Sequence, residues 1–265
     1  MEKRLVYKDG NVFYSTHGKG KPVLLIHGFG EDGSVWDKQL PYLQEHHQLI
    51  VPDLAGSGLS DFNTEIFSMD DHADVVAYIL DDLELKAATI IGHSMGGYIA
   101  LAFAEKYPER LNALGLFHST AYADNEEKKA TRDKGIAFIK QHGAVRFQEQ
   151  TIPNLFSDIS KKEHPDLVDE IIARFTNFKD ESLVHYYEAM MQRPDRTEIL
   201  KKTDKPVLFI AGENDTAIPL QHSLEQGHLP ELSYFHILKN SGHMGMLEET
   251  NSSNLFLENF LRTVK

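Results

Sequence analysis

The chain has 265 residues, no cysteine, and 40 acidic against 27 basic side chains, for a formal net charge of −13 with histidine neutral. That length suits one large α/β domain, or one core with an insertion, and it is enough to bury a substantial apolar core. The acidic excess argues against nucleic acid as a partner, and the lack of cysteine excludes disulfides, thiolate metal sites and a cysteine nucleophile.

The N-terminal segment predicts neither a targeting signal nor a membrane anchor. Residues 1–10 contain no apolar core of signal-peptide length. No later segment reaches the roughly 18 uninterrupted apolar residues of a membrane span. We therefore expect a cytoplasmic protein with no membrane partner.

Residues 5–16 are typical of a β-hairpin, with Asp9 and Gly10 as its turn.

Two apolar runs of the kind buried on both faces of a parallel sheet, 22–26 and 48–51, follow the hairpin. The predicted strands are 22–26, 48–51, 88–91, 111–117, 206–211 and 234–238. Helical patterns are predicted at 70–83, at 97–107 and at the C-terminal end through Phe256, Phe260 and Leu261. This alternation of strand and helix predicts a mostly parallel, doubly wound α/β sheet.

Between residues 120 and 196 the alternation stops and the sequence becomes helical and charged. The helices predicted there mix apolar and charged positions at helical spacing, and they span 126–142, 144–155, 165–177 and 180–192. A structureless loop of that length would be unusual. We interpret the segment as a helical cap inserted into a core formed by residues 1–119 and 197–265.

The sequence from Gly92 to Gly97 places a serine between two glycines, directly after the predicted strand 88–91 and before a predicted helix. A serine at such a sharp strand-to-helix turn takes strained backbone angles. Glycines two residues before and after it let neighbouring backbones approach. Ser94 is therefore the candidate nucleophile.

Polar residues also follow other predicted strands at their carboxyl ends, where ligands of open α/β sheets bind. Asp215 follows strand 206–211 and His243 follows strand 234–238. A serine hydroxyl is a poor nucleophile until a base removes its proton during attack. His243 is the candidate base, and Asp215 would hold its ring through Nδ1. With Ser94, these residue types predict ester hydrolysis.

The oxyanion of a tetrahedral intermediate needs preorganised hydrogen-bond donors. The backbone amide of Met95, directly after the nucleophile, and that of Phe29, in a glycine-rich loop after strand 22–26, are the candidates. Four more side chains are candidates for contact with the substrate, each with a structural role as its alternative: His27, His93, His118 and Trp36.

Two other polar groups are not assigned to chemistry. We expect Asp53, after strand 48–51, to organise the turn at Gly56 and Gly58 rather than to take part in the reaction. His46 and His47 are adjacent and could be considered as metal ligands, but no carboxylate or histidine follows them at helical ligand spacing. We therefore expect neither a metal nor an organic cofactor.

Five motifs occur in an order that resembles the α/β-hydrolase superfamily along nearly the whole chain. They are His27–Gly30, Pro52–Asp61, Gly92–Gly97, Gly212–Asp215 and Gly242–His243. The resemblance implies an α/β-hydrolase fold, with an eight-stranded, mostly parallel sheet and a helical cap inserted after the sixth strand. It also implies that Ser94 is the nucleophile, Asp215 the acid and His243 the base. Phe29 and Met95 take the oxyanion-hole positions.

The cap is similar to those of 3-oxoadipate enol-lactonase-like hydrolases, through Thr120–Asp124, Leu155–Ser157 and Met191–Arg196. His118 departs from that pattern, because lactonase-like members more often carry aspartate at the end of strand six. We expect a serine esterase or lactonase that acts on a small carboxylic ester through an acyl-enzyme. The alternatives are perhydrolysis, cleavage of a carbon–carbon bond with the same triad, and a ligand-sensing signalling protein.

Overall fold

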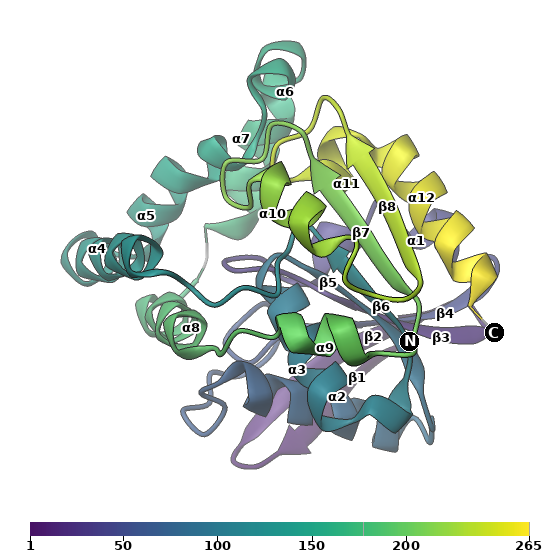
Figure 1. Ribbon diagram of the computed structural model, residues 1–265. Coiled ribbons are helices and arrows are strands. Elements are labelled where there is room, and N and C mark those ends of the chain that lie inside the picture. The colour runs from purple at the N-terminus through teal and green to yellow at the C-terminus, as the bar shows by residue number, and fades with distance from the viewer. Residues whose placement is uncertain (177, 265) are drawn as a thin grey trace.

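The computed structural model describes residues 1–176 and 178–264 and contains an eight-stranded sheet, ordered β1-β2-β4-β3-β5-β6-β7-β8 (Figure 1). β1 and β2 form an antiparallel pair at one edge, β2 is antiparallel to β4, and the other neighbours are parallel. The strands are β1 (Glu2–Tyr7), β2 (Gly10–His17), β3 (Lys21–Ile26), β4 (His47–Pro52), β5 (Ala88–His93), β6 (Leu111–Phe117), β7 (Val207–Gly212) and β8 (Ser233–Leu238). The predicted eight-stranded, mostly parallel α/β sheet is confirmed.

The N-terminal hairpin turns one residue earlier than predicted. Tyr7 pairs with Gly10, so Lys8 and Asp9 form the two-residue turn and Gly10 begins β2. Lys8, the first residue of the turn, has a φ of 52°, and the primed hairpin turns require a positive φ at that position. The register follows from burial, since a shift by one residue would turn the buried Val12 to the opposite face.

Alternate residues of the central strands supply two hydrophobic cores, one on each face of the sheet. In β3, Leu24 and Ile26 belong to one core, whereas Val23 and Leu25 belong to the other. This division follows from the pleat, which points successive side chains to opposite faces. The apolar runs in the sequence therefore reflect burial on both faces.

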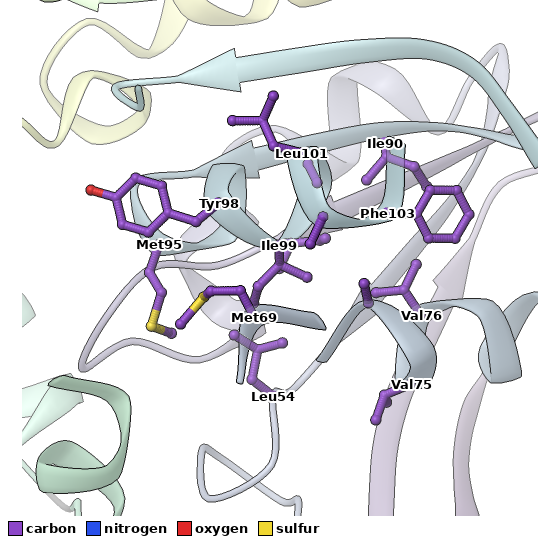
Figure 2. Close-up of a cluster of buried hydrophobic side chains, with 14 of the residues drawn as sticks. Leu54, Met69, Val75, Val76, Ile90, Met95, Tyr98, Ile99, Leu101 and Phe103 are labelled. Atoms are coloured by element: carbon purple, nitrogen blue, oxygen red, sulfur yellow. The ribbon is translucent and has the colours of Figure 1, made fainter. Parts of the chain in front are cut away.

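Helices cover both faces of the sheet, as a doubly wound fold requires (Figure 1). On the face of the first core lie α2 (Met69–Asp82) and α3 (Met95–Lys106), and on the other lie α1 (Leu40–Leu43) and α12 (Thr250–Thr263). Figure 2 shows side chains of α2 and α3 gathered in one buried cluster with Leu54 and Ile90. α2 begins one residue before the predicted start, because Ser68 and Asp71 form a capping box there.

Between β6 and β7 the chain forms a group of helices that lies at one end of the sheet, away from both marked termini (Figure 1). We call these the insertion helices: α4 (Glu126–His142), α5 (Ala144–Thr151), η3 (Ile152–Leu155), α6 (Asp158–Glu163), α7 (Pro165–Phe175) and α8 (Asp180–Gln192). α4 and α8 have the predicted bounds. The predicted helix 144–155 is instead split into α5 and η3, with Pro153 in the first turn of η3. Asn177, the last residue of another predicted helix, lies outside the described residues.

Several short helices were not predicted, because they are too short to display a helical period. They are η1 (Gly33–Trp36), η2 (Pro108–Arg110), α9 (Thr197–Lys202), α10 (Leu220–Gln226) and α11 (Gly245–Glu248), together with α1 and α6. Over residues 1–176 and 178–264, no helix has the length and apolar character needed to cross a membrane.

Candidate functional site

Ser94 lies at a sharp turn between β5 and α3. Its backbone has a φ of 52° and a ψ of −115°, which is strained for any residue except glycine. The turn is held in place because the Ser94 N–H donates to the carbonyl of Phe117 at 2.9 Å, and the hydroxyl of Ser119 donates to the carbonyl of Ser94 at 2.7 Å. Such retained strain is typical of functional sites.

The two glycines that flank the serine are required by close backbone contacts. A Cβ atom on Gly92 would overlap the carbonyl group of Gly96. A Cβ atom on Gly96 would lie 2.5 Å from the carbonyl oxygen of Ile26 and 2.6 Å from that of His27. The turn after β5 therefore packs directly against the end of β3, and only glycine fits at either position.

Asp215 and His243 form a buried hydrogen-bonded pair. His243 Nδ1–H donates to Asp215 Oδ2 at 2.8 Å, which makes the other ring nitrogen, Nε2, the acceptor. Asp215 Oδ1 accepts the backbone N–H groups of Ala217 at 2.8 Å and Ile218 at 2.9 Å. Burial alone would raise the pKa of the Asp215 carboxyl, but the charge of His243 and hydrogen bonds from two histidines hold it well below its ordinary value. Asp215 is therefore a carboxylate that can orient a base.

The loop that carries His243 is hydrogen-bonded to His93, the residue before Ser94. His93 Nε2–H donates to the carbonyl oxygen of His243 at 3.0 Å, and the two imidazole rings lie 4.9 Å apart between centroids. Asp215 and His243 therefore meet beyond the carboxyl ends of β7 and β8, and His93 links this pair to the turn of Ser94 after β5.

Glu31 is a site residue that sequence reasoning missed. Its Oε2 accepts the Gly28 N–H at 2.7 Å and His93 Nδ1–H at 2.9 Å, and the Glu31 and His93 side chains are both buried. Burial works against both charges. The charge of each partner and their hydrogen bond nevertheless raise the pKa of His93 and lower that of Glu31. Both shifts favour the ionised form of the pair. An acidic residue directly after the glycine-rich loop was the available signal.

The candidate oxyanion-hole amides belong to Phe29 and Met95. Within the described residues, neither amide donates a hydrogen bond to the protein. The Phe29 ring stacks on Tyr187 of α8, with centroids 4.3 Å apart and planes 10° from parallel. The side-chain amide of Gln148 in α5 donates to the Gly30 carbonyl at 3.0 Å. The insertion helices therefore brace the loop that carries Phe29.

The four predicted substrate contacts are all fully buried against protein. His27 Nε2 accepts the Leu54 N–H at 2.9 Å, while Nδ1–H donates to the Gly28 carbonyl at 2.8 Å. The Trp36 ring packs edge-on against Phe117 with centroids 5.7 Å apart. His93 and His118 likewise bond to protein groups. Buried in this way, the four side chains support the site and do not line a surface open to substrate.

Asp53 organises a loop, in agreement with its predicted structural role. Its Oδ1 accepts the Gly33 N–H at 2.9 Å and its Oδ2 accepts the Leu59 N–H at 2.8 Å. A Cβ atom on Gly58 would overlap the same carboxylate. His47, the other polar residue left without a chemical role, has its Nε2 2.9 Å from a carboxylate oxygen of Glu258, far along the chain.

One group of side chains has the spacing of a metal site. The potential ligand atoms of His118, Asp215 and His243 all lie within 4.8 Å of one another. Two imidazoles and one carboxylate are a ligand set that zinc accepts. An ion held by both Nδ1 atoms would have to displace the protons that they donate to Asp215.

A surface groove of about 810 Å³ lies between β2, the loops after β3 and β4, and the region around α7 and α8. The groove is lined by charges of both signs, including Asp53, Asp61, Arg174 and Lys179. Ser94, Asp215 and His243 are not among the described residues that line it, so it is distinct from the cluster at the strand ends.

Comparisons with known proteins agree with this fold. A family model for the alpha/beta hydrolase fold matches residues 21–250. The chain is 27% identical over 262 residues to 2-hydroxy-6-oxo-2,4-heptadienoate hydrolase of Pseudomonas putida, covering 92% of this chain and 90% of that protein. It is 28% identical to the solved structure of a thermophilic esterase from Thermogutta terrifontis, with a TM-score of 0.93 and 99% of both chains covered. The enol-lactonase from Burkholderia xenovorans LB400 shares the fold, at 20% identity and a TM-score of 0.90, with 98% of this chain and 100% of that chain covered.

Proposed function

This chain belongs to the α/β-hydrolase fold family, and we propose that it is a serine hydrolase that cleaves a small carboxylic ester or lactone through an acyl-enzyme. The observation that carries the proposal is the hydrogen bond of 2.8 Å between His243 and a buried Asp215 carboxylate, beside a serine at positive φ. The Thermogutta structure, at 28% identity, is of an esterase, which supports ester hydrolysis as the reaction.

In the proposed cycle the Ser94 hydroxyl attacks the ester carbonyl while Nε2 of His243 takes its proton. The tetrahedral intermediate then collapses, the bond to the alcohol oxygen breaks, and His243 returns the proton to the leaving alkoxide. Water next attacks the acyl-enzyme with His243 as base, which releases the carboxylic acid and restores Ser94. Asp215 keeps Nδ1 protonated throughout and stabilises the imidazolium.

The proposal assigns the oxyanion of each tetrahedral intermediate to the amides of Phe29 and Met95. Both amides are free of protein acceptors within the described part of the chain, so binding the oxyanion would break no existing bond. Loss of one such donor typically costs roughly 10²- to 10³-fold in rate.

We further propose that residues 120–196 form a cap over a core of residues 1–119 and 197–265. The contact of Tyr187 with Phe29 supports this proposal.

A second candidate reaction is hydrolysis of a carbon–carbon bond next to a ketone. The Pseudomonas relative is named as a hydrolase of 2-hydroxy-6-oxo-2,4-heptadienoate, a keto acid that contains no ester group. The same serine, base and oxyanion donors would serve attack on a ketone carbonyl. The two reactions differ in the leaving group, which is an alkoxide in one case and a carbanion in the other.

The test compares the wild-type protein with Ser94→Ala on p-nitrophenyl acetate, a set of lactones and the keto acid. We expect Ser94→Ala to lose roughly 10³-fold or more of the activity and to lose labelling by a fluorophosphonate probe. Ser252→Ala, at a partly exposed serine of α12, is the matched control and should keep both. Full activity in Ser94→Ala would reject the proposal. Turnover of the keto acid alone would select the second reaction.

A further inference from the structure

His118 brings a second imidazole to the carboxylate that orients His243. It follows β6, its backbone has a φ of 48°, and its side chain has no exposed surface. His118 Nδ1 lies 3.0 Å from Asp215 Oδ2, the same oxygen that accepts the proton of His243 at 2.8 Å. A positive φ in a residue other than glycine is costly, and here it delivers a ring to the acid of the site.

The surrounding backbone leaves room for the imidazole of His118. A Cβ atom on Gly245 would overlap Nε2 of that ring, and a Cβ atom on Gly212 would lie 2.8 Å from its Cε1. Among the described residues, Nε2 has no hydrogen-bond partner. The polar contacts of the ring are therefore made through Nδ1, which faces Asp215.

The proton of His118 is assigned to Nδ1. The Gly212 N–H also points at Nδ1 from 3.2 Å, which would suit an unprotonated nitrogen. A carboxylate oxygen at 3.0 Å is the stronger influence, because two acceptors at that separation would repel each other. Burial lowers the pKa of His118 to about 4, so the ring is a neutral donor at neutral pH.

We propose that His118 is a positioning residue that shares the Asp215 carboxylate with His243 and thereby limits how strongly that carboxylate attracts the proton of His243. The inference rests on the proposed serine hydrolase function. Four N–H groups converge on Asp215, from Ala217, Ile218, His118 and His243. Each donor disperses part of the negative charge, so less of it remains to stabilise the imidazolium that His243 becomes during turnover.

Other charged groups also face His243 and would stay unchanged when His118 is replaced. His93 lies against it from β5 and is paired with Glu31 from the loop after β3. Glu248 of α11 accepts the backbone N–H groups on either side of His243, from Gly242 at 2.9 Å and Met244 at 3.1 Å. A difference between His118 variants and the wild type therefore reports the contact with Asp215.

The experiment compares His118→Phe, which keeps a buried ring without a donor, with His118→Asn. The asparagine Nδ2 stands near the position of Nδ1, and asparagine tolerates a left-handed backbone. For His118→Phe we expect the acidic limb of the profile of kcat/KM against pH, measured on p-nitrophenyl acetate, to move to higher pH by about 0.5 to 1 pH unit. His118→Asn should restore the wild-type limb. Should His118→Phe fail to fold, His118→Leu takes its place.

A second readout needs no turnover. In protein labelled with ¹³C at the histidine Cε1 atoms, the His243 signal, identified by its loss in His243→Gln, should titrate at a higher pH in His118→Phe than in the wild type. An unchanged titration and an unchanged limb would overturn the proposal, as would a lower kcat with no shift of the limb. If Ser94→Ala were as active as the wild type, the proposed function would fail, and the titration of His243 would still decide the role of His118.

Discussion

Glu31 and His93 form an ion pair buried directly behind the nucleophile turn, with 2.9 Å between Oε2 and Nδ1. Through this pair the loop of Gly28, the turn of Ser94 and the backbone of His243 are joined by consecutive hydrogen bonds. A buried ion pair carries a large desolvation cost and persists only where its geometry is good. We interpret it as the frame that holds the three parts of the site in register.

Replacing Glu31 with glutamine should lower both stability and activity. The substitution keeps the shape but removes the charge that raises the pKa of His93, so the bond from His93 to the His243 carbonyl weakens. We expect a loss of about 1 to 3 kcal/mol in the free energy of unfolding. We also expect kcat/KM to fall by roughly tenfold, as a misplaced base would cause. Urea unfolding and ester hydrolysis at pH 7 measure the two effects.

The buried pair of His47 and Glu258 supplies a matched control for that experiment. Its nitrogen and oxygen also lie 2.9 Å apart, and both side chains are 5% exposed. Glu258→Gln should therefore cost stability while leaving kcat/KM close to the wild-type value. Equal losses of kcat/KM in Glu31→Gln and Glu258→Gln would show that the Glu31 pair contributes only to folding.

The stack of Phe29 on Tyr187 predicts that the insertion helices affect the reaction through the oxyanion loop. Tyr187→Ala removes the ring that lies 4.3 Å from Phe29, so the Phe29 amide loses its support. An aromatic pair contributes about 0.5 to 1.5 kcal/mol, which corresponds to a roughly 2- to 10-fold loss of kcat/KM. Tyr187→Phe keeps the ring and should retain the wild-type value. Equal rates for the alanine and phenylalanine variants would refute this coupling.

The local pattern of the sequence was enough to predict the sheet and the sharp turn at Ser94. Strands β3 to β7 are short apolar runs, and their burial on both faces follows from that composition. The turn at Ser94 requires glycines at fixed offsets, which a sequence displays directly. The bounds of α4 were also predictable, because its acidic first turn and the glycine after its end mark both termini.

What the sequence did not predict depends on contacts between distant segments. Glu31 meets a histidine 62 residues away, and His118 meets an aspartate 97 residues away. No local period or motif encodes which side chains share a buried space once the strands are assembled. For the same reason His27 and Trp36 were predicted at the substrate, whereas the fold buries both of them.

His72 of α2 is buried without a hydrogen-bond partner for either ring nitrogen within the described chain. Its ring lies 5.8 Å from that of Tyr186, between centroids. Burial, followed by repulsion from neighbouring histidines, lowers the pKa of His72 to about 3. The ring is therefore neutral in the folded protein at every pH at which the protein is expected to work.

The buried His72 predicts a loss of stability in mild acid that a substitution can remove. The folded pKa of about 3 lies below the unfolded value of about 6.5, so the unfolded chain binds more protons between those two values. The contribution of His72 is complete above about pH 6.5 and is lost as the pH falls toward 3, by about 2 kcal/mol at pH 5. His72→Leu should therefore narrow the difference in unfolding free energy between pH 8 and pH 5 by about that amount, measured by urea titration at both pH values. His46→Leu, at an exposed histidine, is the control and should leave the difference unchanged. If His72→Leu also left the difference unchanged, the buried ring of His72 would make no contribution and the prediction would be wrong.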